Sequence, residues 1–245
     1  MTPFTAELIG TMLLIILGDG VVANVLLNKS KGQNGGWMVV STGWAFAVAL
    51  AVYCVGSVSH GHLNPAVTIA LASIGAFDWD LVPLYITAQM CGALIGSVVV
   101  WLAYLPHWAV TEDPAAKLGV FCTAPGIRDP KSNLLCEAIG TAVLLLGVLL
   151  IGRPGNLNAR AGWDTGFGPF LVGMLVWGIG LSLGGPTGYA INPARDLGPR
   201  IAHAILPIAG KGGSDWSYAW IPVAGPILGG LLGAHLFKML MTPTP

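Results

Sequence analysis

The triplet Asn64-Pro65-Ala66 recurs as Asn192-Pro193-Ala194 in the second half of the chain. Pro is favoured at the first position of a helix and Asn is among the best N-caps, so each triplet predicts a helix start. The apolar pieces 64–74 and 192–204 are too short to cross a membrane, because a spanning helix needs about 20 residues. Two such pieces at matching positions indicate a transport site in a membrane protein.

The composition places the chain in a bilayer. Of its 245 residues, 54% are hydrophobic and 9% are charged, whereas a soluble domain has about 25% charged residues. The net charge is zero and offers no basic surface for nucleic acid. The four cysteines show no metal-ligand spacing, so we expect neither a metal nor another cofactor. We expect a multi-pass protein of the cell membrane, specifically of a bacterial plasma membrane.

Long apolar stretches predict the spanning helices. They lie at 4–27, 37–57, 82–104, 133–152, 168–186 and 217–240. The connections hold most of the charges and many Gly, Pro and Asn residues, so they predict loops. These loops lie at 28–36, 105–132, 153–167 and 204–216. The chain is therefore expected to be an all-α membrane protein with a single transmembrane channel domain over 1–245.

The two halves of the chain resemble each other, as internal repeats of about 1–105 and 133–242. The segment Glu7-Leu8-Ile9-Gly10-Thr11 is echoed by Glu137-Ala138-Ile139-Gly140-Thr141. Each repeat holds three spans, an odd number, so the second repeat must cross the membrane upside down relative to the first. We expect six transmembrane helices plus two half-helices in an inverted repeat, with the half-helices entering from opposite faces and meeting near the middle.

The two Asn side chains are candidate hydrogen-bond donors at this centre. The amide oxygen of each caps its own helix, which leaves the NH2 group as a donor. The positive ends of both half-helices face the same point, so a cation is repelled there. A water molecule that accepts from both Asn64 and Asn192 cannot relay a proton. The arrangement predicts a channel for neutral molecules that excludes protons and ions.

Arg195 lies in the first turn of the second half-helix. An arginine inside a membrane is a functional candidate, here as a donor to solute oxygens at the narrowest point. The alternative is an ion pair with the neighbouring Asp196. The extended runs before each triplet have backbone carbonyl groups without partners at membrane depth. We expect these carbonyls to face the channel lumen, where they serve as a ladder of hydrogen-bond acceptors. This carbonyl ladder is expected at His60, Gly61, His62, Gly188, Tyr189 and Ala190.

At these residues the chain resembles the aquaporin family over nearly its whole length. The matching motifs are Ala6-Glu7, His62-Leu63-Asn64-Pro65-Ala66-Val67-Thr68, Glu137 and Asn192-Pro193-Ala194-Arg195-Asp196. Within that family it is similar to the glycerol facilitators. This branch has Asp after the Arg and a basic residue four positions further on, here Asp196 and Arg200. It also has Pro before an aliphatic residue in the last span, here Pro226-Ile227.

The resemblance implies roles for further residues. The selectivity constriction maps onto Trp44, Gly180, Tyr189 and Arg195. A water-only pore is expected to have His at position 180, and Gly there leaves room for a carbon chain. Glu7 and Glu137 are implied to be buried carboxylates that hold the loops, and the family assembles as tetramers in which each subunit has its own pore. The implied lumen lining is Leu14, Val48 and Val176.

Two positions depart from the glycerol facilitators. Tyr189 stands where they commonly have Phe, and its hydroxyl makes the constriction more polar. His60 replaces a small residue before the first triplet. It is either a solvated loop residue or a group that titrates near the pore mouth around neutral pH.

The main hypothesis is a passive channel for glycerol and similar small neutral solutes, with some water permeability. One alternative is a facilitator for undissociated small organic acids such as lactic acid, and another is mainly a water channel. A third is an intramembrane enzyme or proton-coupled carrier that uses Glu7 and Glu137 as acid and base. Since no span contains a nucleophile–His pair or metal-ligand spacing, we expect the chain not to be an enzyme.

Overall fold

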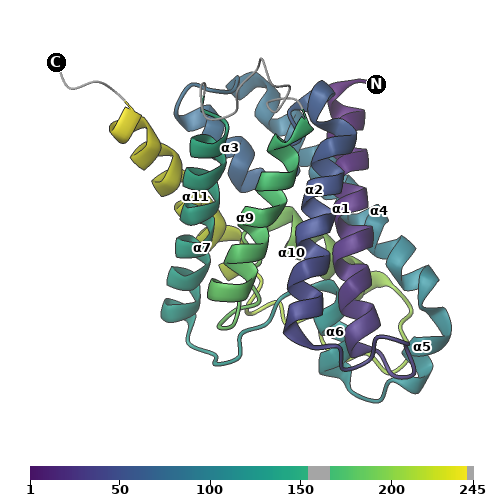
Figure 1. The fold of residues 1–245 in the computed structure, drawn as a ribbon. Coiled ribbons are helices and arrows are strands. Elements are labelled where there is room, and N and C mark those ends of the chain that lie inside the picture. Colours follow the sequence, from purple (N-terminus) through teal and green to yellow (C-terminus); the bar gives the residue numbers. More distant parts are fainter. Residues whose placement is uncertain (154–165, 242–245) are drawn as a thin grey trace.

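The computed structural model describes residues 1–153 and 166–241, and the regular elements in those ranges are all helical. The expected loop at 153–167 lies almost entirely outside the described residues. The elements, drawn in Figure 1, are α1 (Pro3–Leu26), α2 (Gly36–Ser59), α3 (Pro65–Ser73), η1 (Trp79–Leu81), α4 (Val82–Ala103), α5 (Leu105–Val110), α6 (Pro114–Phe121), α7 (Pro130–Ile151), α9 (Gly168–Leu183), α10 (Pro193–Ile205) and α11 (Ile221–Met241).

All six predicted spans are helices. Five of them, α1, α2, α4 together with η1, α7 and α11, are long and apolar enough to cross a membrane. The sixth, α9, has 16 residues, or about 24 Å of helix, which is less than the roughly 30 Å of the hydrocarbon core. It is apolar and packs against α2 and α7. The start of α1 and the end of α11 lie on the same face, at the top of Figure 1. The chain is a multi-pass membrane protein.

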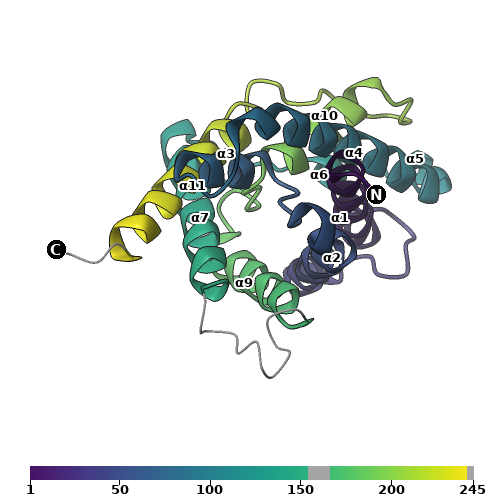
Figure 2. The same cartoon turned by 90° about the horizontal axis from the view of Figure 1, so that it is seen from above.

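The helices pack in a pattern that repeats between the two halves. In the first half α1 packs on α4, and in the second half α7 packs on α11. Each half-helix packs on the last span of the other half, α10 on α4 and α3 on α11, and α2 of the first half packs directly on α9 of the second. Seen from above, the long helices surround the segments that lead into α3 and α10 (Figure 2). This is the predicted arrangement of six helices and two half-helices in an inverted repeat.

Glycines let the first and last span of each half approach closely. A Cβ atom at Gly92 of α4 would overlap the carbonyl oxygen of Leu8 in α1, and one at Gly229 of α11 would overlap that of Ala138 in α7. The same holds for the glycines one turn further along both helices. Small residues spaced by four are therefore used for packing inside this chain.

The expected loop at 105–132 contains two short helices, α5 and α6. Pro114 stands at the start of α6, and the Asp113 side chain caps it by accepting the N–H of Ala115 at 2.8 Å. Trp108 and Phe121 are buried in a second apolar cluster between these helices and the ends of the spans. Helix-start residues and local burial thus outweigh the polar composition on which the loop prediction rested.

Candidate functional site

Two cavities adjoin inside the helix bundle. The inner cavity has a volume of about 140 Å³ and the outer one about 330 Å³. Both are lined by Trp44, Tyr189 and Arg195, so these three side chains form the boundary between them. Since one water needs about 10–15 Å³ of such volume, the inner cavity has room for several waters. The predicted lumen residues Leu14, Val48 and Val176 all line the inner cavity.

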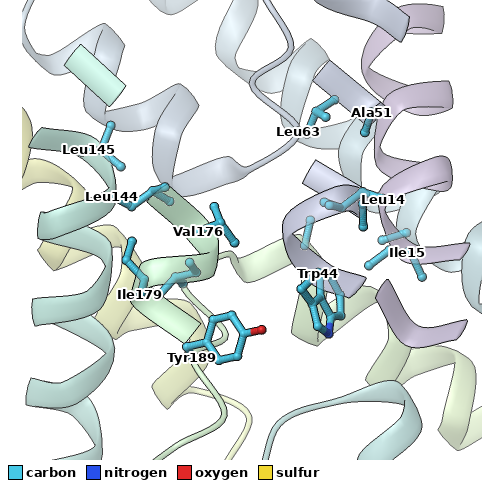
Figure 3. Close-up of a cluster of buried hydrophobic side chains, with 14 of the residues drawn as sticks. Leu14, Ile15, Trp44, Ala51, Leu63, Leu144, Leu145, Val176, Ile179 and Tyr189 are labelled. Atoms are coloured by element: carbon cyan, nitrogen blue, oxygen red, sulfur yellow. The ribbon is translucent and has the colours of Figure 1, made fainter. Parts of the chain in front are cut away.

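The boundary between the cavities is partly aromatic and partly cationic. The Arg195 guanidinium carbon lies 4.1 Å from the centroid of the Trp44 ring, a cation–π contact. Figure 3 shows Tyr189 opposite Trp44, with its hydroxyl directed toward the Trp44 side. This hydroxyl is buried and makes no hydrogen bond to any described residue. Three of the four predicted constriction residues therefore come together.

The fourth, Gly180, lies behind Tyr189 and lines neither cavity. A Cβ atom at Gly180 would lie only 2.8 Å from Cζ of Tyr189. Trp37 supports the same ring, because its Nε1 donates to the carbonyl of Gly180 at 2.9 Å and its ring meets that of Tyr189 edge-on at 5.6 Å. Gly180 thus affects the opening by admitting the Tyr189 ring and not by facing the lumen itself. The part played by Trp37 was not predicted.

The half-helices start at the two asparagines, as predicted. Each amide oxygen accepts the backbone N–H two residues further on, at 2.9 Å for Asn64 and 3.0 Å for Asn192. Each amide nitrogen donates across the centre, from Asn64 to the carbonyl of Ile191 and from Asn192 to that of Leu63, both at 2.8 Å. One N–H of each amide therefore joins the two loops, a contact that was not predicted, and the other N–H of each is left as a donor for a solute.

Glu7 holds the loop before α3. Its carboxylate accepts the backbone N–H groups of His62 at 3.0 Å and Leu63 at 2.7 Å. The side chains of Ser59 and Gln89 also donate to it, both at 2.7 Å. This buried charge is therefore satisfied by four donors, in accord with the expectation that the loop binds it.

Glu137 binds the loop before α10 in the same way. It accepts the N–H groups of Ala190 at 3.0 Å and Ile191 at 2.8 Å. Leu63 and Ile191 have φ angles of 51° and 43°, in the left-handed region. Such a conformation costs about 1–3 kcal/mol for a residue other than glycine, so it persists only where the surroundings impose it. The two carboxylates supply that restraint.

The segments before the half-helices turn sharply and are not extended as the sequence suggested. His60, Gly61 and Gly188 have φ angles of 64°, 63° and 83°. Among the described residues, no donor contacts the carbonyl oxygens of the predicted ladder, and the ladder residues line the inner cavity except Gly188, which lines the outer one. Residues at both cavities therefore have backbone carbonyl oxygens that accept no hydrogen bond from a described residue.

Arg195 is not paired with its neighbour Asp196. Asp196 binds Arg200, with Nη2 2.8 Å from Oδ1, and also accepts the hydroxyl of Thr123 at 2.7 Å. The carboxylate near Arg195 is that of Asp19 in α1, whose Oδ1 lies 3.7 Å from Nη1. The sequence holds one signal for this contact, namely an acidic residue within an apolar span. Among the described residues, no three His, Cys, Asp or Glu side chains come together as a metal site.

Glu7→Gln is expected to lower the midpoint of thermal unfolding in detergent by about 5 °C. The variant turns one acceptor oxygen into a donor that faces other donors, and a hydrogen bond to a charged group contributes about 1.5–3 kcal/mol. Fluorescence-detected unfolding of the purified protein measures the change. The exposed Glu112→Gln serves as the control. Equal midpoints for both variants would show that Glu7 does not restrain the loop.

Comparison with known proteins places this geometry in a family. The family model described as major intrinsic protein matches residues 1–237. A Thermotoga maritima protein described as a probable glycerol uptake facilitator protein is 63% identical over 98% of this chain and 100% of its own length. A Bacillus subtilis glycerol uptake facilitator protein is 60% identical over 97% of this chain and 84% of its own length.

A solved structure has the same fold. The X-ray structure of the aquaglyceroporin from Plasmodium falciparum matches with a TM-score of 0.83 and 29% sequence identity, over 97% of this chain and 95% of that one. The family model, the relatives and the fold all agree with the resemblance carried by the two Asn-Pro-Ala triplets. The chain belongs to the major intrinsic protein family.

Proposed function

We propose that this chain is a passive channel for glycerol and similar small neutral solutes, with some water permeability, that excludes protons and ions. The observation that carries the proposal is the pair of adjoining cavities that share Trp44, Tyr189 and Arg195. The names of the Thermotoga and Bacillus relatives support glycerol as the solute. A channel makes and breaks no covalent bond, so the proposal includes no enzymatic reaction.

The shared boundary suits a polyol because it is polar on one side and apolar on the other. The Arg195 guanidinium can donate to hydroxyl oxygens that have left their hydration water. The rings of Trp44 and Tyr189 offer an apolar surface to the carbon chain. Free carbonyl oxygens on the loops then accept from the solute hydroxyls as it moves along the inner cavity.

Exclusion of charge rests on the two helix ends. The N-termini of α3 and α10 meet where Asn64 and Asn192 donate across the centre. Their partial positive charges disfavour a cation or a hydronium ion at this point. The remaining N–H of each amide is oriented by the bond made by the other, so a water between them accepts and does not pass a proton on.

A second solute class is undissociated small organic acids such as lactic acid. The Tyr189 hydroxyl favours it, because this group is buried without a partner at the constriction and can bond a more polar solute. The neutral acid has the size and the hydroxyl group of a small polyol, whereas its anion carries a charge that the proposed channel excludes. Uptake that follows the neutral fraction across a pH series, measured beside glycerol uptake, tests this possibility.

We also propose that the channel is a homotetramer, as the family resemblance implies. The residues that line both cavities come from a single chain, so each subunit is expected to conduct by itself. Mass measurement of the purified protein in detergent tests the assembly. A monomer with full glycerol permeability would contradict the tetramer and leave the pathway in place.

The pathway is tested by placing a bulky side chain in the inner cavity. Val48→Trp is expected to abolish glycerol flux into proteoliposomes in stopped-flow light scattering, because Val48 lines the cavity. Val39→Trp, at an exposed position on the same helix, is the matched control and should conduct as the unmodified protein does. Wild-type flux no greater than that of empty liposomes, or full flux in Val48→Trp, would contradict the proposed function.

A further inference from the structure

Asp19 stands apart from the other buried acids of the structure. It is fully buried in α1 and lines neither cavity, whereas Arg195 lines both. Its two carboxylate oxygens accept no hydrogen bond from any described residue. The guanidinium of Arg195 lies nearby, with its Nη1 3.7 Å from Oδ1 of Asp19. Asp19 therefore lies behind the arginine, outside the path of the solute.

The other buried carboxylates have other tasks. Glu7 and Glu137 bind the N–H groups of the two loops, and Asp196 binds Arg200 and Thr123. A buried carboxylate is strongly disfavoured unless it is paired or hydrogen-bonded. Since Asp19 makes no hydrogen bond within the described part of the chain, the charge of Arg195 is the interaction that accounts for an acid at this depth.

Arg195 is held on several sides. The Trp44 ring lies 4.1 Å from its guanidinium carbon, and the Phe121 carbonyl accepts from Nη1 at 3.5 Å. Asp19 approaches the same Nη1 atom. The carboxylate and the carbonyl thus draw one end of the guanidinium away from the lumen, while the rest of the group remains available to a solute.

We propose that Asp19 is a positioning and charge-balancing residue for Arg195, which keeps the constriction selective for uncharged solutes. The inference rests on the proposed function and deepens it. Paired with Asp19, Arg195 donates hydrogen bonds to solute hydroxyls while the two residues together carry no net charge. Without Asp19 the constriction would carry a full positive charge beside two positive helix ends, a combination that attracts anions.

The test compares nitrate with glycerol in the same proteoliposomes. Nitrate is a small anion without a neutral form at working pH, so its flux reports on charge selectivity alone. Asp19→Asn keeps the size of the side chain and removes its charge. The ratio of nitrate to glycerol permeability is expected to rise at least fivefold. Asp80→Asn, an exposed residue of η1, removes the same charge elsewhere and should leave the ratio unchanged.

A double-mutant cycle shows whether Asp19 acts through Arg195. In an Arg195→Gln background, Asp19→Asn should change the ratio by less than twofold, because a buried carboxyl without its cation becomes neutral. The double variant should also yield more folded protein than Arg195→Gln alone, since removing one member of a buried pair destabilises more than replacing both. A loss of stability alone would lower both fluxes and leave their ratio unchanged.

An unchanged ratio in folded Asp19→Asn would overturn the inference. Loss of folded protein in Asp19→Asn that Arg195→Gln does not restore would also overturn it, because Asp19 would then serve the fold through another contact. Failure of the proposed function has a different signature, since the wild type itself would then pass no glycerol. In that case the nitrate permeability of Asp19→Asn relative to wild type still decides the role of Asp19.

Discussion

Gly180→His is expected to lower glycerol permeability at least tenfold relative to water permeability. A Cβ atom at position 180 would lie 2.8 Å from Cζ of Tyr189, so the ring must move, and the imidazole adds a polar group beside it. The opening then becomes narrower and offers glycerol less apolar surface. Each ~1.4 kcal/mol of added barrier slows the passage of glycerol tenfold. Water fits a narrower opening and needs only hydrogen bonds, so it should lose much less.

Both permeabilities of Gly180→His are measured by stopped-flow light scattering in one batch of proteoliposomes with protein content matched. Gly178 provides the control, because it lies on the same helix and a Cβ atom there meets no atom of the described residues within 4 Å. Gly178→His should keep the wild-type ratio of glycerol to water. If Gly180→His also keeps it, Tyr189 does not set the width of the path and the constriction has been assigned to the wrong residues.

Asn192→Asp is expected to raise proton or cation flux at least tenfold while glycerol flux falls. In the wild type the Asn192 amide donates to the Leu63 carbonyl at 2.8 Å. The carboxylate of the variant can still cap α10, but it cannot make this donation. It also places a negative charge at the point where the two positive helix ends meet. Two unit charges 4 Å apart interact by about 4 kcal/mol at an effective dielectric constant of 20. A third of that energy suffices to raise the proton or cation flux tenfold.

Proton flux in Asn192→Asp is measured with a pH-sensitive dye inside the vesicles, and cation flux as current across a planar bilayer. Asn34→Asp makes the same chemical change at an exposed loop position. This variant should exclude protons and cations as well as the wild type does. An Asn192→Asp channel that excludes ions as well as the control would mean that the helix ends and the asparagines do not form the barrier to charge.

The parts of the structure that were predictable are those encoded by local chemistry. The Asn-Pro pairs predict helix starts, and α3 and α10 begin at Pro65 and Pro193. The family resemblance implies a buried acid that binds the loop in each half, and Glu7 and Glu137 each accept two backbone N–H groups. Caps, spans and an odd number of spans per repeat can all be derived from one sequence.

The parts that were missed depend on contacts between residues far apart in the chain. The bonds of the Asn64 and Asn192 amides to the opposite loops form only when the two half-helices meet. Gly180 affects the path through the ring of Tyr189, a relation that no spacing reveals. Asp19 stands out in the sequence only as an acid within an apolar span, because its partner lies more than a hundred residues away.

The central claim is that neutral solutes pass along the shared boundary of the two cavities while charge does not. It is tested most directly by measuring glycerol uptake and proton flux in the same wild-type proteoliposomes. We expect glycerol permeability well above that of empty liposomes and proton flux equal to theirs. A robust proton or ion current that accompanies glycerol uptake, and disappears in Val48→Trp together with it, would contradict the account.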